Sequence, residues 1–157
     1  MLSDGEILEL VTSGHISIVP FSENNLTPNG YDLCVGGVEM NGVMVEPNSS
    51  KKYRIPPLVS FRVLSMEYVT LANSFVANLQ LKQKFARQGI QATFSQIDAE
   101  FFGTLTFCCF NGNETSFELE FVVPFCQIVF TKLDVPPLKG YAERSGHYKN
   151  QKDVVLK

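Results

Sequence analysis

The chain has 157 residues, of which 45% are hydrophobic and 18% are charged, and its formal net charge is -3. This length and composition fit one folded domain and exclude a disordered chain, and the acidic balance argues against a dedicated nucleic-acid binder. No window approaches the roughly 18 uninterrupted apolar residues of a membrane span, and no basic stretch precedes an apolar one at the N-terminus, so we expect a cytoplasmic protein that does not enter a membrane.

The first predicted element is a short N-terminal helix. Ser3 can cap it, Glu6 three residues later completes a capping box, and Gly14 ends it. After Gly14 the apolar period changes to two and turn residues become frequent, which is typical of short strands. The predicted strands are Ile16–Val19, Tyr31–Val35, Val43–Val45, Leu58–Leu64, Tyr68–Leu71, Phe75–Leu81, Gln91–Phe94, Gly103–Phe110, Phe117–Val122 and Gln127–Leu133.

Turn signals separate these runs, among them Pro28-Asn29-Gly30, Gly36-Gly37 and Asn111-Gly112-Asn113. Many short strands with close turns favour a β-barrel or a β-sandwich. The sequence contains no internal repeat with a period of 20–50 residues. We therefore predict one mainly β domain over residues 1–157 with a small N-terminal helix.

Cysteine and histidine spacing excludes a zinc site of the usual kinds. No C-x-x-C pair is present, and the H-x-E and P-C-x-x-C signature of zinc nucleobase deaminases is missing. Any deamination would have to proceed without zinc. We interpret all four cysteines as buried reduced thiols on strands: Cys34, Cys108, Cys109 and Cys126.

Three segments combine a turn with charged residues. The run from Leu26 to Leu33 delivers Asp32 at a strand start after a Pro-Asn-Gly turn. The run from Leu81 to Ile90 holds three cations, which suit either a solvated edge or a phosphate clamp: Lys82, Lys84 and Arg87. The run from Ile97 to Asn111 begins with two carboxylates at alternate positions, either a polar turn or an acid/base pair.

The C-terminal region is mildly basic. This charge fits either a solvated chain end or an arm that holds a small polyanion. Its cations outnumber its acids after Thr131. The segment before it, from Pro124 to Phe130, places Gln127 on a strand. A side-chain amide on a strand usually only forms hydrogen bonds with neighbouring polar groups.

Taken in chain order, these segments resemble the motifs of the dCTP deaminase/dUTPase family. Leu26–Leu33 is similar to its x-P-x-S/G-Y-D-L motif, and Leu81–Ile90 to the deaminase G-R-S-S-x-A-R-x-G-L, with Gln83 and Lys84 at the two serines. Ile97–Asn111 resembles both the deaminase I-D-P-G-F/W-x-G and the dUTPase I-D-x-D-Y-R-G runs. Tyr148 and Gln151 match the deaminase tail K-Y-x-x-Q, and the resemblance extends from Leu2 to Gln151.

The resemblance implies a distorted β-barrel that forms a homotrimer with shared active sites and acts on a pyrimidine deoxynucleoside triphosphate. Residues 134–157 would be a C-terminal arm over the nucleotide. Asp98 would act on the attacking water, Phe101 would stack on the deoxyribose, and Asp32 would order Mg²⁺ through water. The implied phosphate and arm contacts are Lys82, Lys84, Arg87, Gln127, Tyr148, Lys149 and Gln151.

The resemblance also distinguishes two reactions. The deaminase glutamate that activates water at C4 of cytosine falls on Cys108, and a thiol is a poor general acid/base there. Glu100, the candidate carboxylate nearby, is out of register with this glutamate by eight residues. We therefore favour hydrolysis of dUTP to dUMP and pyrophosphate, with dCTP deamination, alone or combined, as the alternative and a catalytically weak nucleotide-binding protein as the third.

Overall fold

The computed structural model describes residues 1–144, in which two β-sheets dominate. The helices are α1 (Asp4–Thr12), α2 (Gln83–Arg87) and α3 (Tyr141–Arg144), with a 3-10 turn at Glu23–Asn25. The strands are β1 (Ile16–Val19), β2 (Leu26–Thr27), β3 (Gly30–Met40), β4 (Val43–Val45), β5 (Lys52–Ile55), β6 (Ser60–Leu71), β7 (Phe75–Leu81), β8 (Ile90–Thr93), β9 (Phe102–Asn111), β10 (Phe117–Glu120) and β11 (Pro124–Lys132).

The main sheet has the order β7-β11-β3-β6-β9-β8, and β1, β2 and β4 pair with its strands from the side. A bridge between Ala77 on β7 and Ile97, in the segment joining β8 to β9, brings the two edges of this sheet together. The main chain of these two residues exchanges hydrogen bonds of 2.8 and 3.0 Å. The sheet is thereby curled into a nearly closed barrel, which confirms the predicted mainly β, barrel-like fold.

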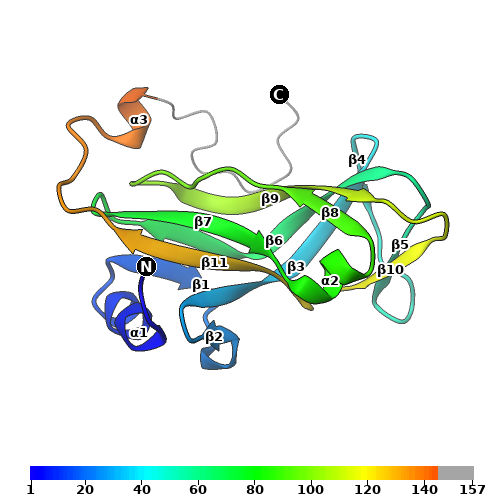
Figure 1. Ribbon diagram of the computed structural model, residues 1–157, viewed down its shortest axis with the longest axis horizontal. Helices are drawn as coiled ribbons and strands as arrows, with labels where there is room; N and C mark the ends of the chain where they lie inside the picture. The colour runs from blue at the N-terminus through cyan, green and yellow to red at the C-terminus, as the bar shows by residue number, and fades with distance from the viewer. Residues whose placement is uncertain (145–157) are drawn as a thin grey trace.

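Helix α1 forms where its capping residues predicted it. The Ser3 side chain accepts the Glu6 amide hydrogen bond at 3.4 Å, and the Glu6 carboxylate accepts the Ser3 amide at 2.8 Å. These two contacts satisfy backbone donors that the helix itself cannot pair. In Figure 1, α1 and α3 lie at one end of the barrel and the small β5–β10 sheet lies at the other. No helix within residues 1–144 is long and apolar enough to cross a membrane.

Aromatic rings fill much of the barrel interior. Phe107 and Phe125 are fully buried and stack with their ring centroids 6.1 Å apart. Phe85 anchors α2 to this stack, at 4.8 Å from the Phe125 ring. The segment that the sequence predicted as either a solvated edge or a phosphate clamp forms a short helix, and Phe85 supplies its apolar anchor.

The Gly36-Gly37 pair lies inside β3, not in the turn that the sequence predicted. The pairing of β3 with β6 shifts register between Val35 and Gly37, which is a β-bulge. A Cβ atom on Gly36 would approach the Met66 backbone to 2.7 Å, so only glycine allows the two strands to touch. A second register shift between Leu64 and Tyr68 lets β6 run through as one strand where two were predicted.

A buried polar network lies beside these bulges. The Ser65 hydroxyl donates to the Glu67 carbonyl at 2.8 Å and accepts the Leu105 amide hydrogen bond at 2.9 Å. The Glu67 carboxylate accepts the Cys34 amide at 2.9 Å and is almost fully buried. Burial raises the pKa of the Glu67 carboxyl above its ordinary value, since desolvation disfavours the charged form.

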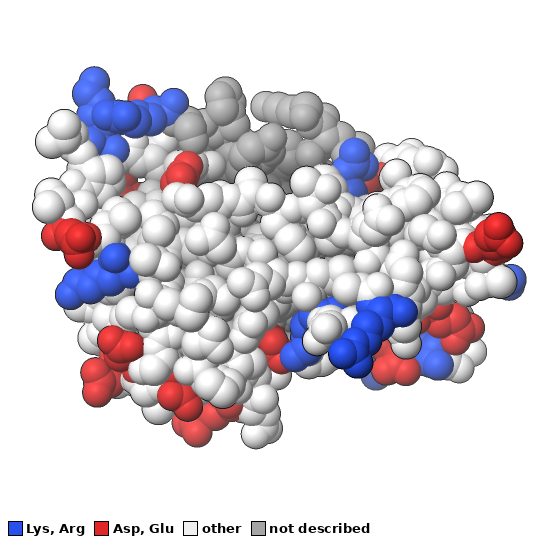
Figure 2. All heavy atoms as spheres, in the orientation of Figure 1, with Lys and Arg blue, Asp and Glu red and all other residues white. Residues whose placement is uncertain are grey.

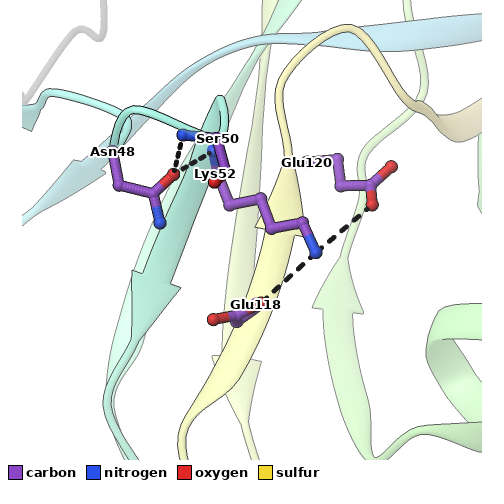
Figure 3. A network of polar contacts seen from close by, with 5 residues as sticks. All are labelled: Asn48, Ser50, Lys52, Glu118 and Glu120. Atoms are coloured by element: carbon purple, nitrogen blue, oxygen red, sulfur yellow. Dashed lines mark hydrogen bonds and ion pairs between the residues drawn. The ribbon is translucent and has the colours of Figure 1, made fainter.

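The two-stranded sheet of β5 and β10 carries an exposed ion-pair network (Figure 3). The Lys52 ammonium lies between Glu118 at 3.4 Å and Glu120 at 3.7 Å. The Asn48 side chain shapes the preceding turn by accepting the amides of Ser50 and Lys52. Because the pairs are exposed, each is worth at most about 1 kcal/mol.

Candidate functional site

A polar pocket of about 250 Å³, called pocket 2 below, opens beside the start of α2. Asp32 on β3, Gln127 on β11 and Gln80 on β7 are cross-strand neighbours, so their side chains form one row. Gln127 donates a hydrogen bond to the Thr27 hydroxyl at the rim of the pocket. The strand pairing thus gathers residues from distant parts of the sequence, including the predicted site residues Asp32 and Gln127.

The Lys82 ammonium forms an ion pair with one carboxylate oxygen of Asp32 in pocket 2. The other oxygen, Oδ1, is buried without a hydrogen-bond partner among the described residues. Such an acceptor calls for a donor from water or from a ligand. Lys82 therefore has a structural partner already, which the sequence did not reveal.

The predicted Mg²⁺ fits Asp32 only through water. Within residues 1–144 no group of three or more His, Cys, Asp or Glu side chains could hold a metal ion. Asp32 Oδ1 is free to accept a hydrogen bond from a metal-bound water. Since Mg²⁺ commonly keeps several waters and binds substrate phosphates, this outer contact suits it.

A basic surface covers α2. Lys84 and Arg87 are exposed on this helix, and Lys82 precedes it. Figure 2 shows Lys and Arg side chains gathered over the position of α2. The Lys84 ammonium also lies 4.7 Å from the Phe85 ring centroid. Three of the predicted phosphate contacts therefore lie on or beside one short helix, next to pocket 2.

A larger pocket of about 630 Å³, called pocket 1 below, lies over the outer face of β6, β8 and β9. It shares no lining residue with pocket 2. Strand pairing aligns Glu39 with Arg62, Arg62 with Cys108, and Cys108 with Thr93. Arg62, Cys108 and Thr93 line the pocket, and Glu39 lies beside them on β3.

Cys108 is exposed in pocket 1, whereas the other three cysteines are buried. The prediction of four buried thiols is thus wrong for Cys108, because alternation on β9 turns it to the outer face. Burial raises the pKa of the Cys34 thiol to about 11 and that of Cys126 to about 12, and it also raises the pKa of the Cys109 thiol. Those three thiols are therefore poor nucleophiles.

Asp98 lies on an exposed turn whose backbone is fixed on both sides. The preceding residue, Ile97, bridges to β7, and the Phe101 carbonyl accepts the Leu71 amide at 2.9 Å. Asp98 itself lines neither pocket. Within one chain the structure therefore does not bring the predicted catalytic carboxylate to the phosphate or pocket 1 residues.

Glu100 and Phe101 hold the beginning of α3. The Glu100 carboxylate accepts the Tyr141 amide at 3.1 Å, and the Phe101 ring contacts the Tyr141 ring edge-on at 6.1 Å. Phe101 is buried within the chain, so its predicted stacking on a sugar would require a rearrangement. Three predicted site residues lie outside the described residues: Tyr148, Lys149 and Gln151.

Sequence reasoning missed Glu39 and Arg62. Neither belongs to a motif, and the only signal was a charge on strands that otherwise bury apolar side chains. Glu39 is buried and paired with Arg62, whose Nη1 lies 2.5 Å from its Oε2. Such a pair becomes visible only when the register of β3 and β6 is known.

The fold and the two pockets define a β-barrel protein with a basic surface beside a polar pocket. No protein-family model matches the chain. A dCTP deaminase of Thermococcus kodakarensis is 35% identical over 142 residues, covering 90% of each chain. A dUMP-forming dCTP deaminase of Aquifex aeolicus is 30% identical over 169 residues, covering 99% of this chain and 92% of the relative. The chain belongs to the dCTP deaminase/dUTPase family, whose members are enzymes.

Solved structures agree on the fold. A dCTP deaminase from Agrobacterium tumefaciens superimposes with a TM-score of 0.68 at 16% identity, over 84% of this chain. This chain spans about half of that protein, 48% of its length. A mutant dUTPase of phage phi11 of S. aureus, described with a structural Mg(II) ion, gives a TM-score of 0.56 at 14% identity, over 80% of this chain and 95% of the dUTPase.

Proposed function

We propose that this protein is a cytoplasmic pyrimidine deoxynucleoside triphosphate hydrolase that converts dUTP to dUMP and pyrophosphate. The observation that carries this choice is the composition of pocket 1. No aspartate or glutamate lines it among the described residues, and Cys108 is exposed there. Deamination at a base bound in this pocket would lack a carboxylate to move protons.

The basic surface on α2 supports binding of the triphosphate. Lys84 and Arg87 are exposed, and their charges are available to phosphate oxygens. Lys82 would contribute less, because Asp32 partly neutralises it. Mg²⁺, held mainly by the phosphates and through water by Asp32, would neutralise developing charge on the phosphates.

Hydrolysis requires one water and one proton acceptor. The water oxygen would bond to the α-phosphorus while the bond to the bridging oxygen breaks and pyrophosphate leaves. The Asp98 carboxylate would orient this water and take its proton, a role that commonly contributes 10²–10⁴-fold in rate. Its exposed turn leaves it accessible to a ligand bound partly by another copy of the chain.

The second candidate is dCTP deamination, alone or followed by hydrolysis. The Thermococcus and Aquifex relatives support it, since both bear the deaminase name and one of them is dUMP-forming. If this chain deaminates dCTP, the proton-moving group must come from outside the set of residues that line pocket 1.

A single assay separates these reactions. The full chain is incubated with dUTP and, separately, with dCTP in the presence of Mg²⁺, and nucleotides are resolved by chromatography while ammonia is measured. We expect dUMP and pyrophosphate from dUTP, and no ammonia from dCTP above a protein-free control. Ammonia release from dCTP would favour the deaminase, and the absence of both reactions would leave a nucleotide-binding protein without catalysis.

The basic surface is tested with two charge-removing variants. Lys84→Ala and Arg87→Ala should raise the KM for dUTP with little change in stability, because both side chains are exposed. Lys51→Ala, an exposed cation away from both pockets, is the matched control. Unchanged KM in both variants would remove α2 from the phosphate site.

A further inference from the structure

The turn that carries Asp98 contacts the C-terminal segment, and the reaction described above gives this contact no role. We propose that Glu100 is a positioning residue, which holds the C-terminal segment against this turn and so places cations beside Asp98. The inference rests on the proposed function, because that function brings the phosphates of the nucleotide to Asp98. It adds the residue that brings a second group of positive charges to them.

Two side chains of the turn reach the C-terminal segment. The Glu100 carboxylate accepts the Tyr141 amide hydrogen bond at 3.1 Å, and the Phe101 ring meets the Tyr141 ring edge-on at 6.1 Å. Phe101 is buried, and its amide donates to the Asp98 carbonyl at 3.3 Å within the same turn. The C-terminal segment is therefore joined to the turn itself, close to Asp98.

Glu100 occupies its place with a strained backbone. Its φ is 65°, in the left-handed region that glycine enters freely and that other residues rarely adopt. Strain of this kind persists where the surrounding structure holds it, and it is concentrated at functional sites. Since glycine would suit this backbone better, the benefit of a glutamate lies in its carboxylate, which accepts the Tyr141 amide.

Gly140 makes room for this carboxylate. A Cβ atom at position 140 would overlap Glu100 Oε2 and lie 3.0 Å from Glu100 Cδ, so glycine is what lets the side chain reach the Tyr141 amide. Because the obstacle is the end of a flexible side chain, an alanine at 140 would displace the carboxylate and leave both backbones in place. Glu100 and Gly140 thus fit each other across a long separation in sequence.

The contact determines where positive charge lies relative to Asp98. Lys139 directly precedes Gly140, and Arg144 ends α3, and both are exposed. Figure 2 shows Lys and Arg side chains gathered over the position of α3. From residue 139 to the end of the chain, five Lys and Arg stand against two Asp and Glu. The segment that Glu100 ties to the turn therefore carries the charge that phosphate oxygens require.

The first test is the binding of the non-hydrolysable α,β-imido analogue of dUTP with Mg²⁺, measured by calorimetry on the full chain. Glu100→Gly breaks the contact and suits the backbone of the turn, whereas Gly140→Ala breaks it and keeps the Glu100 charge. Both should weaken binding about 5-fold or more, the low end of typical coupling between two sites. Glu100→Gln keeps an acceptor oxygen without the charge, so it should bind as the wild type does.

The two disrupting variants share one cause, so their effects should not add. With Glu100→Gly in place, the new Cβ of Gly140→Ala meets no carboxylate, and the double variant should bind like either single one. Glu114→Gly removes an exposed carboxylate before β10 and is the control with wild-type binding. Additive losses, or wild-type binding by both single variants, would overturn the assignment of Glu100.

The charges themselves are tested by combining Lys139→Ala with Arg144→Ala. Both side chains are exposed, so the variant should fold normally and should still bind the analogue more weakly than the wild type. Wild-type affinity in this variant would contradict the placing of cations beside Asp98.

Hydrogen exchange of the Tyr141 amide gives a readout that needs no catalysis. Its protection should fall in Glu100→Gly and Gly140→Ala and persist in Glu100→Gln. Because coupling is reciprocal, the bound analogue should in turn raise this protection in the wild type. Protection that the analogue leaves unchanged would overturn the link between the segment and the phosphates.

Steady-state hydrolysis of dUTP separates this inference from the proposed function. The KM should rise in Glu100→Gly and Gly140→Ala with kcat near the wild-type value, because Ile97 and Phe101 keep their backbone bonds to β7 and β6. Hydrolysis with a normal KM in both variants would remove the positioning role alone. Analogue binding that depends on Glu100 without hydrolysis would remove the proposed reaction alone, and no binding of the analogue would overturn both.

Discussion

Asp98 is the residue on which the proposed hydrolysis depends most directly. The Asp98→Asn variant should keep the fold and the binding of the dUTP analogue, because the side chain is exposed and the turn is fixed by backbone bonds. Hydrolysis of dUTP should fall by at least about 10²-fold, the low end for a general base. Steady-state kinetics with Asp134→Asn as an exposed control measures this, and unchanged kcat would remove Asp98 from the mechanism.

Glu67 gives the protein a pH dependence of stability that the proposed catalysis does not involve. Burial raises its pKa in the folded state above the unfolded value, so its contribution to stability is complete below the unfolded pKa and is lost as pH rises through the folded pKa. Glu67→Gln, which stays neutral, should therefore gain stability relative to the wild type as pH rises.

Denaturant unfolding at about pH 4 and about pH 8 measures the difference in free energy of unfolding between the two proteins. The difference should favour the variant more at the higher pH. Glu118→Gln, exposed on β10, is the control without this trend. An equal difference at both pH values would contradict the argument.

Among the elements, β3 tolerates substitution least at its bulge, where it pairs with β6. Gly36→Ala would force a Cβ to within 2.7 Å of the Met66 backbone, and neither strand can yield easily. We expect a loss of about 1–3 kcal/mol in the free energy of unfolding, typical of overpacking. Gly5→Ala on α1, where a Cβ meets nothing within 4 Å, should instead be neutral or stabilising. Thermal unfolding of both variants checks the contrast.

Local chemistry explains which elements the sequence revealed. Ser3 and Glu6 predicted α1 because capping needs only neighbours in the sequence. Alternation predicted most strands, but it could not tell a glycine pair in a turn from one in a bulge, since that depends on the partner strand. Helix α2 was missed because five residues carry too little periodicity, and its stability comes from Phe85 against Phe125.

At the scale of the whole molecule, the candidate site is divided. Pocket 1, pocket 2 and Asp98 occupy separate places on one chain. A working site therefore calls for surfaces from more than one copy, and a closed cyclic oligomer provides them. We predict a trimer, with a sedimentation mass three times the 17.5 kDa of one chain. An active protein that sediments only as a monomer at micromolar concentration would contradict this assembly.

Of the residues in the candidate site, the sequence could indicate those that lie close together along the chain, but not the pairs that form across the barrel. The motifs pointed to Lys82, Lys84 and Arg87, which lie on or directly before α2. The ion pair of Lys82 with Asp32 joins positions 50 residues apart, and that of Glu39 with Arg62 needs the register of two strands. Motifs carry no information on such partners.

The uneven burial of the four cysteines makes Cys108 a natural chemical probe of pocket 1. Three thiols are buried with raised pKa values, so a mild alkylating reagent near neutral pH should modify Cys108 first. Since Cys108 lines pocket 1, the speed of its labelling becomes a gauge of whether that pocket is filled. Mass spectrometry should find one adduct per chain, formed more slowly when the dUTP analogue is bound, with no mutation or attached dye required.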